Sequence, residues 1–234
     1  MATTADVTTA NTIPVLDQGF LALDGALASD LAVVNAARVS FNQATDEMTE
    51  RDEGLIRFLI RNRHGSPFEH GYFRFLVKAP LFVVREHHRH RAGHSYNEWS
   101  GRYSKMDAEF YVPENVRTQI GKPGNYTFEP VEDHVRDEAR REIEENAERA
   151  FEAYERMLEQ GVAKEVARAV LPLSTYTKYY WSCNPRSLMH FCGLRNHENA
   201  QYEIQQYAAA AETFLERLMP ITHAAFIAND RTAP

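Results

Sequence analysis

A dense run of basic residues is the part of this sequence best suited to chemistry. Six of the ten histidines lie between His64 and His94, and residues 85–91 read Arg-Glu-His-His-Arg-His-Arg in a chain of net charge −7. Like charges repel, so this crowding requires a counter-anion. Arginine presents a planar fork of donors that matches phosphate. The run therefore predicts a site for a phosphorylated ligand.

A second cationic group follows Asn184-Pro185, a pair that is typical of a helix start, with Asn as the N-cap and Pro in the first turn. We expect this helix to run to about Arg195. Arg186 and His190 are four residues apart and so share one face of it. The free N–H groups at a helix N-terminus also attract anions. The segment 184–195 is thus predicted to form another part of the same anion site.

Three other interpretations of these residues remain open. The basic run could be a solvated surface. His90 and His94 are four residues apart and could bind zinc in a hydrolase, although Gly93 interrupts helical geometry and the neighbouring arginines repel a dication. The arginines, together with the aromatic residues Tyr96, Trp99 and Tyr103, could also bind RNA or another phosphate-rich ligand without catalysis.

The elements that must position these residues can be predicted from hydrophobic periodicity. Alternation of Phe73, Phe75 and Val77 predicts a strand over Tyr72–Lys78, and Pro80 is expected to start a helix that reaches Arg91. Few strands and several long helices indicate a mixed α/β or α+β fold with a small sheet. The remaining predicted elements are helices over 54–62, 134–160, 163–170 and 200–218, strands over 109–112 and 175–181, a loop over 94–103 and a surface excursion over 113–130.

Length and composition set the broad class. With 234 residues, 44% hydrophobic and 25% charged, we expect one domain over residues 14–228, between tails at 1–13 and 229–234. No run of 18 apolar residues and no secretory signal is visible, so we expect no membrane association. Two cysteines indicate a reducing, cytoplasmic location. An excess of acidic residues (33 against 26 basic ones) argues against a general nucleic-acid binder.

Residues 89–103, Arg-His-Arg-Ala-Gly-His-Ser-Tyr-Asn-Glu-Trp-Ser-Gly-Arg-Tyr, closely resemble the signature of the flavin-dependent thymidylate synthases. The likeness extends over residues 31–222. It includes the turn 64–70 and three further segments: 36–40, similar to the family's first strand, 168–172 and 184–195. Two differences stand out. Eight residues separate Arg91 from Ser100 where the family usually has seven, and Asn199 stands where the family often has histidine, so that His197 is a possible substitute.

The resemblance implies an α/β enzyme that converts dUMP to dTMP, with 5,10-methylenetetrahydrofolate as carbon donor and NADPH as reductant through bound FAD. It also implies a homotetramer whose active sites are shared between subunits, and we expect Arg89 and Arg195 of one site to come from different chains. No metal is implied.

The resemblance also implies a role for each matching residue. Arg195 is the expected catalytic residue, which stabilises negative charge on the pyrimidine, while Ser100 orients the nucleotide, and His64 lies on the folate side. The expected FAD contacts are Ser40, Ser66, Arg89, His90, Arg91, Glu98, Asn184, Arg186 and His190. The expected nucleotide contacts are Glu86, His87, His88, Arg89, Glu98, Trp99, Ser100, Gly101, Arg102, Arg168 and Arg195.

Overall fold

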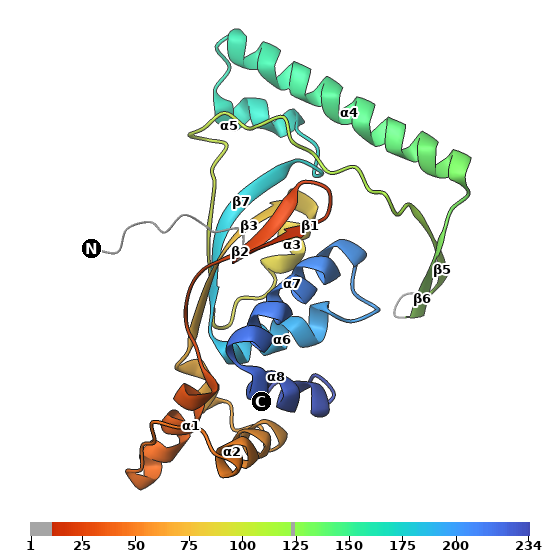
Figure 1. The fold of residues 1–234 in the computed structure, drawn as a ribbon. Helices are drawn as coiled ribbons and strands as arrows, with labels where there is room; N and C mark the ends of the chain where they lie inside the picture. The colour runs from red at the N-terminus through yellow and green to blue at the C-terminus, as the bar shows by residue number, and fades with distance from the viewer. Residues whose placement is uncertain (1–10, 123–124) are drawn as a thin grey trace.

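A five-stranded antiparallel sheet forms the centre of the computed structural model, which describes residues 11–122 and 125–234 (Figure 1). Its strands lie in the order β1-β2-β3-β7-β4, and each pairs antiparallel with its neighbour. The predicted mixed fold with a small sheet is confirmed. The bounds are Thr12–Val15 for β1, Gly19–Leu27 for β2, Tyr72–Pro80 for β3, His94–Glu98 for β4 and Tyr176–Cys183 for β7.

The N-terminal end of the chain differs from expectation. Thr12 and Ile13 belong to β1, which pairs with β2, so the tail expected over residues 1–13 does not extend through them. Its first ten residues lie outside the described part of the chain. Strand β2 was not predicted at all.

The two central strands confirm the sequence prediction. In β3, Phe73, Phe75 and Val77 are fully buried, whereas Tyr72 is 39% exposed. The rings of Phe75 and Trp181, on the paired strand β7, lie 4.9 Å apart. One face of the sheet therefore carries the core, and the other, around Tyr72 and Tyr180, is open in the single chain.

Four helices cover or edge the core face: α3 (Leu81–His87), α6 (Pro185–Arg195), α7 (Tyr202–Leu218) and α8 (Pro220–Ala228). Helix α7 packs Phe214 against Phe75, and its Tyr207 hydroxyl donates to the Lys78 carbonyl at 2.6 Å. The predicted helices over 184–195 and 200–218 are confirmed. Helix α3 ends at His87, four residues before the expected end at Arg91, and α8 was not predicted.

The segment expected to be the family's first strand is helical. Residues 36–38 end α1 (Asp30–Arg38), and residues 39–41 form the 3-10 helix η2. Ser29 caps α1 by accepting a hydrogen bond from the Ala32 N–H at 3.1 Å, and Arg38 pairs with the buried Asp52 of α2 (Glu50–Arg61). The helix predicted over 54–62 begins earlier, because Thr49 and Asp52 form a capping box.

Strand β4 occupies the first half of the loop that was expected over residues 94–103, and residues 99–103 are loop and turn as expected. Its hydrogen bonds go to β7, with His94 opposite Cys183 and Glu98 opposite Tyr179. Polar residues form a strand here because a long-range partner satisfies the backbone. The strand expected over 109–112 is reduced to a single bridge between Phe110 and Thr175.

Residues 117–122 and 125–170 extend from the sheet as an arm (Figure 1). It contains a hairpin of β5 (Arg117–Lys122) and β6 (Asn125–Pro130), where only a surface excursion was expected. The predicted long helix is confirmed as α4 (Asp133–Glu159), and the shorter one as α5 (Lys164–Ala167) with the 3-10 helix η4 (Arg168–Val170). Phe151 and Tyr154 of α4 pack with Met106 in a separate small core. No helix in the described ranges is long and apolar enough to cross a membrane.

Candidate functional site

Arg195, in the last turn of α6, is fixed by residues from the segment after β3. Its Nε donates to His90 Nε2 at 2.9 Å, and its Nη1 lies 2.7 Å from a Glu86 carboxylate oxygen. Its Nη2 donates to the Glu86 carbonyl at 3.3 Å. A guanidinium has five N–H groups, so two have no partner among the described residues and can face a ligand. The arrangement holds one cation in a defined orientation before any ligand arrives.

His90 must be neutral in this arrangement. Because Arg195 donates to its Nε2, that nitrogen carries a lone pair and the ring proton sits on Nδ1. Burial, together with the nearby Arg195 charge, lowers the pKa of His90 to about 4. His90 therefore orients Arg195 without adding positive charge of its own.

His94 is also a neutral hydrogen-bond acceptor, and its partner is Trp181 of β7. The Trp181 indole N–H donates to His94 Nδ1 at 2.9 Å, and the two rings are nearly parallel. Burial, with His190 nearby, lowers the pKa of His94 to about 4. The lengthened spacer after Arg91 thus places a neutral imidazole beside the arginines.

Arg195, His90 and His94 line a cavity of about 480 Å³, which we call the arginine cavity. Among the described residues of its wall none is acidic, and the Glu86 carboxylate that pairs with Arg195 is not one of the lining residues. This part of the wall consists of Arg89, His90, Arg91, Ala92, His94, His190, Leu194 and Arg195. Arg89 and Arg195 therefore come together within one chain, which contradicts the expectation that they come from different chains.

A larger cavity of about 870 Å³ lies along α6, and we call it the α6 cavity. Asn184 caps the helix by accepting from the Ser187 N–H at 2.8 Å, and Arg186 and His190 project from the next turns. Ala92, His190 and Leu194 line both cavities, so the two are contiguous. Gly93 (φ +72°) approaches so closely that a Cβ there would stand 2.2 Å from Ser187 Oγ.

Gly101, Arg102 and Arg168, three of the expected nucleotide residues, form a separate group. A Cβ on Gly101 would lie 3.3 Å from Arg168 Cδ, and Arg102 Nε donates to Glu165, close to Arg168, at 3.2 Å. Strand β4 separates this group from the arginine cavity. Its four residue steps span about 13 Å. One chain therefore does not bring Arg102 and Arg168 to Arg195.

Several other expected contact residues lie away from both cavities. His87 is 1% exposed, with Trp181 and Phe191 at ring distances of 4.3 and 4.6 Å, so its side chain belongs to the core. His88 packs against Tyr96 at 4.5 Å. The expected residues outside the described cavity walls are Ser40, His64, Ser66, Glu86, His87, His88, Glu98, Trp99, Ser100, Gly101, Arg102 and Arg168.

Other residues of the α6 cavity were not anticipated as ligand contacts. These are Arg63 and Glu69, from the segment around η3 (Ser66–Glu69), and residues 230–234. Glu69 accepts from Arg186 Nη1 at 2.5 Å. The sequence around Arg231 has no pattern that indicates contact with a distant cavity. The contribution of residues 230–234 to the cavity wall could therefore not be predicted from the sequence.

The neutral histidines predict a measurable pH dependence of stability. The pKa of His94 is about 4 in the folded protein, against 6.5 for the free group, so only the unfolded chain takes up this proton between those values. The contribution of neutral His94 to the free energy of unfolding is therefore greatest above pH 6.5, and it decreases as the pH falls toward 4. Between pH 6 and 5, we expect wild type to lose about 1 kcal/mol more than His94→Gln, whose amide can still accept from Trp181. Urea unfolding at both pH values tests this, and equal losses would contradict it.

Taken together, the fold and the two cavities present arginines, carried by α6 and by the segment after α3, whose geometry suits phosphorylated ligands. The family model "Thymidylate synthase complementing protein" matches residues 23–221. The chain belongs to this family.

Curated relatives and solved structures agree with this assignment. A flavin-dependent thymidylate synthase of Streptomyces coelicolor is 48% identical over 221 residues, which cover 88% of this chain and 90% of that protein. One from Kosmotoga olearia is 44% identical, covering 92% of this chain and 93% of its own. A crystal structure of the UMP/dUMP methylase PolB from Streptomyces cacaoi, bound with 5-Br dUMP, gives a TM-score of 0.87 at 44% identity and covers 95% of this chain and 100% of that one.

Proposed function

We propose that this protein catalyses the reductive methylation of dUMP to dTMP, with methylenetetrahydrofolate as carbon donor and NADPH as reductant through bound FAD. The observation that carries the proposal is the preset Arg195 guanidinium, held by Glu86 and His90 at the wall of a cavity that has no acidic lining among the described residues. The relatives named flavin-dependent thymidylate synthase support the reaction and the cofactor class.

The donors of the α6 cavity fit FAD. The cofactor contains a diphosphate, and the cavity offers the guanidinium groups of Arg186 and Arg63. The close approach of Gly93 to Ser187 leaves no room for a side chain between the loop and the helix. When bound, the reduced flavin supplies the hydride. Asn184, Arg186 and His190 would hold the cofactor here, and Arg89 and Arg91 extend the positive wall toward the nucleotide.

Arg195 has the properties needed to activate a pyrimidine. C5 is a poor nucleophile until negative charge develops on N3 and the carbonyl oxygens. A guanidinium fixed in advance stabilises that charge without reorganising, which is commonly the largest catalytic contribution. Among the described residues, no histidine or carboxylate is a hydrogen-bond partner of Ser100, and its Oγ accepts from the Arg102 N–H at 3.3 Å. A hydroxyl nucleophile requires a base, so we assign Ser100 to nucleotide orientation.

The substrate range includes a second candidate. One solved relative is named a UMP/dUMP methylase and was crystallised with either 5-Br dUMP or 5-Br UMP. UMP is therefore the natural competitor to test beside dUMP in every binding and activity assay.

In this proposal the domain expected over residues 14–228 also includes Thr12 and Ile13 of β1 and the C-terminal residues 229–234, which pack on the fold instead of forming a tail, and the chain works as a cytoplasmic homotetramer with shared active sites. The separation of Arg168 from Arg195 supports active sites shared between subunits, because Arg168 must then come from a second chain to reach the nucleotide at Arg195. Exposed apolar side chains support assembly: Val39 is 74% and Phe41 77% exposed on either side of Ser40. In a tetramer these positions, including Ser40, can face a neighbouring chain's cofactor. Two buried free cysteines agree with a reducing compartment.

The first experiment is flavin binding. Purified protein incubated with FAD should retain it, and Arg186→Ala should weaken FAD binding roughly 10- to 100-fold, the equivalent of one charge-assisted hydrogen bond. Arg89→Ala should act in the same direction. Fluorescence titration gives the affinities, with Arg136→Ala on the exposed face of α4 as control. A wild-type protein that binds no flavin would refute the proposed function, whereas unchanged affinity in both site variants would refute only their assignment.

A further inference from the structure

The last six residues of the chain, 229–234, form a strap that follows α8 and returns to α6. Residues 230–234 all line the α6 cavity. The strap lies beyond residues 23–221, which the family model matches, so it adds a wall to this cavity from outside that region.

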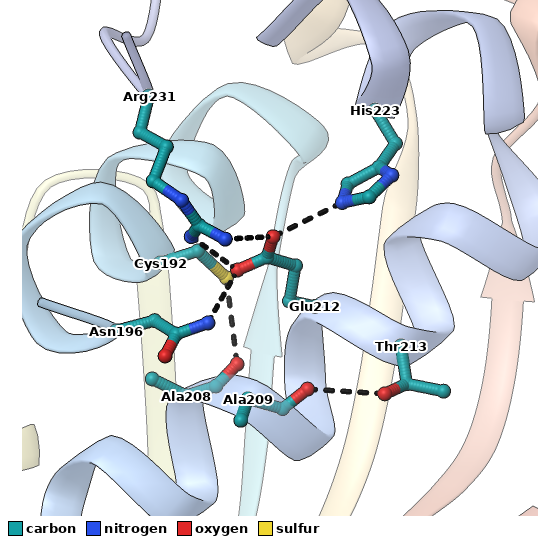
Figure 2. Close-up of polar contacts among 8 residues, drawn as sticks. All are labelled: Cys192, Asn196, Ala208, Ala209, Glu212, Thr213, His223 and Arg231. Carbon is teal, nitrogen blue, oxygen red and sulfur yellow. Dashed lines mark hydrogen bonds and ion pairs between the residues drawn. The ribbon is translucent and has the colours of Figure 1, made fainter. Parts of the chain in front are cut away.

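Glu212, on α7, anchors the strap (Figure 2). Its carboxylate oxygens accept from Arg231 Nη1 and Nη2 at 2.6 and 2.7 Å, a bidentate pair. Asn196 donates to the same carboxylate at 2.8 Å, and His223 Nε2 lies 3.0 Å from it. The Arg231, Asn196 and His223 contacts lower the pKa of Glu212 although burial opposes this, so the carboxylate is ionised.

The strap backbone is also fixed. Asp230 and Arg231 both have left-handed φ values, 51° and 55°, which turn the chain sharply after α8. The Arg231 N–H donates to the Phe226 carbonyl at 3.1 Å, and the Thr232 N–H donates to the Asn229 carbonyl at 3.0 Å. At Gly193 of α6 a Cβ would stand 2.4 Å from the Arg231 carbonyl oxygen, so strap and helix touch through their backbones. The bidentate pair between Arg231 and Glu212 and the tight turn at Asp230 and Arg231 fix the strap in place. The strap is therefore a fixed wall of the cavity rather than a lid that opens.

The far end of the strap holds Arg186. A main-chain oxygen of Pro234 accepts from Arg186 Nε at 2.6 Å, and Glu69 accepts from Nη1 at 2.5 Å. These contacts fix the plane of the guanidinium and leave the rest of its N–H groups free for a ligand. A flexible arginine must lose rotamer freedom on binding, so prior fixation favours binding.

We propose that Glu212 and Arg231 are positioning residues for the cofactor. By clamping the strap against α6 they hold Arg186, and the cavity wall beside it, in the arrangement that receives the diphosphate of the dinucleotide. This inference rests on the proposed function, and it adds a determinant of cofactor affinity on a segment outside the family-model match.

The test uses three full-length variants that disturb the strap in independent ways. Glu212→Gln removes the charge of the anchor, Arg231→Met removes its donors, and Gly193→Ala pushes the Arg231 carbonyl away without altering any charge. We expect each to weaken FAD binding about tenfold, with dUMP binding changed by less than about twofold. Arg231→Lys, which keeps the charge but not the bidentate geometry, should fall between wild type and Arg231→Met. Fluorescence titration with FAD, and separately with dUMP, gives both affinities.

Matched controls separate positioning from general destabilisation. Gly54→Ala places a methyl group on α2 where nothing lies within 4 Å, and Glu155→Gln removes an exposed ion pair with Lys105. Both should bind FAD as wild type does. The proposal is wrong if folded Glu212→Gln and Gly193→Ala bind FAD with unchanged affinity, or if FAD and dUMP affinities fall together. If Glu212→Gln does not fold, the FAD and dUMP affinities of Gly193→Ala and Arg231→Lys decide whether the proposal holds. A wild type that fails to bind FAD would instead refute the proposed function.

Discussion

Replacing Arg195 by alanine should lower the rate of dTMP formation by about 10²–10³-fold, the loss typical when one preorganised donor to a developing anion is removed. The guanidinium is held from two sides, by Glu86 at 2.7 Å and by the neutral His90 at 2.9 Å. Removing it leaves the Glu86 carboxylate unopposed beside the pyrimidine, which disfavours negative charge there. Single-turnover measurement of dUMP-dependent flavin oxidation, together with dTMP formation, reports this loss.

Ser100→Ala is the informative comparison for that result. If Ser100 only orients the nucleotide, this variant should keep measurable turnover while its dUMP binding weakens. Arg136→Ala, which removes an arginine paired with Asp133 on the surface of α4, controls for loss of a charge alone. An inactive Ser100→Ala with normal dUMP binding, combined with an active Arg195→Ala, would show that a serine nucleophile and not direct attack by C5 operates.

Mixing two inactive variants should restore activity if the residues they lack meet only across a subunit boundary. Arg168 lies beside Gly101 at one end of β4, and Arg195 lies beyond the other end, so a single chain keeps them apart. After subunit exchange between Arg168→Ala and Arg195→Ala proteins, about a quarter of the sites should combine both wild-type side chains. We therefore expect recovery of roughly a quarter of the wild-type rate. The assay is dTMP formation before and after exchange.

The chain offers its own control for this experiment. Arg89 and Arg195 line one cavity of one chain, so a mixture of Arg89→Ala and Arg195→Ala proteins should gain nothing. Exchange must be demonstrated independently, for example with differently tagged chains. Recovery by the Arg89 mixture, or none by the Arg168 mixture despite exchange, would contradict the arrangement of the site described above.

The sequence by itself determined the chemistry and the local elements. Crowded arginines in an acidic chain required an anion, and the Asn184-Pro185 start placed Arg186, His190 and Arg195 on one helix, as the structure has them. Alternation along Tyr72–Lys78 predicted β3, because a strand with one buried face repeats every second residue. These patterns are local, so a single sequence suffices to interpret them.

The tertiary structure decided which of these residues meet. Strand β4 exists because β7 satisfies the backbone of a polar segment, and it separates Ser100–Arg102 from the arginine cavity. His87 is a core residue rather than a side-chain ligand because Trp181 and Phe191 close around it. Arg231 reaches Glu212 only because α8 turns the chain back onto α6 and α7. Such contacts join residues 19 to more than 100 positions apart, and no spacing in the sequence encodes them, since they depend on how packed elements bring distant segments together.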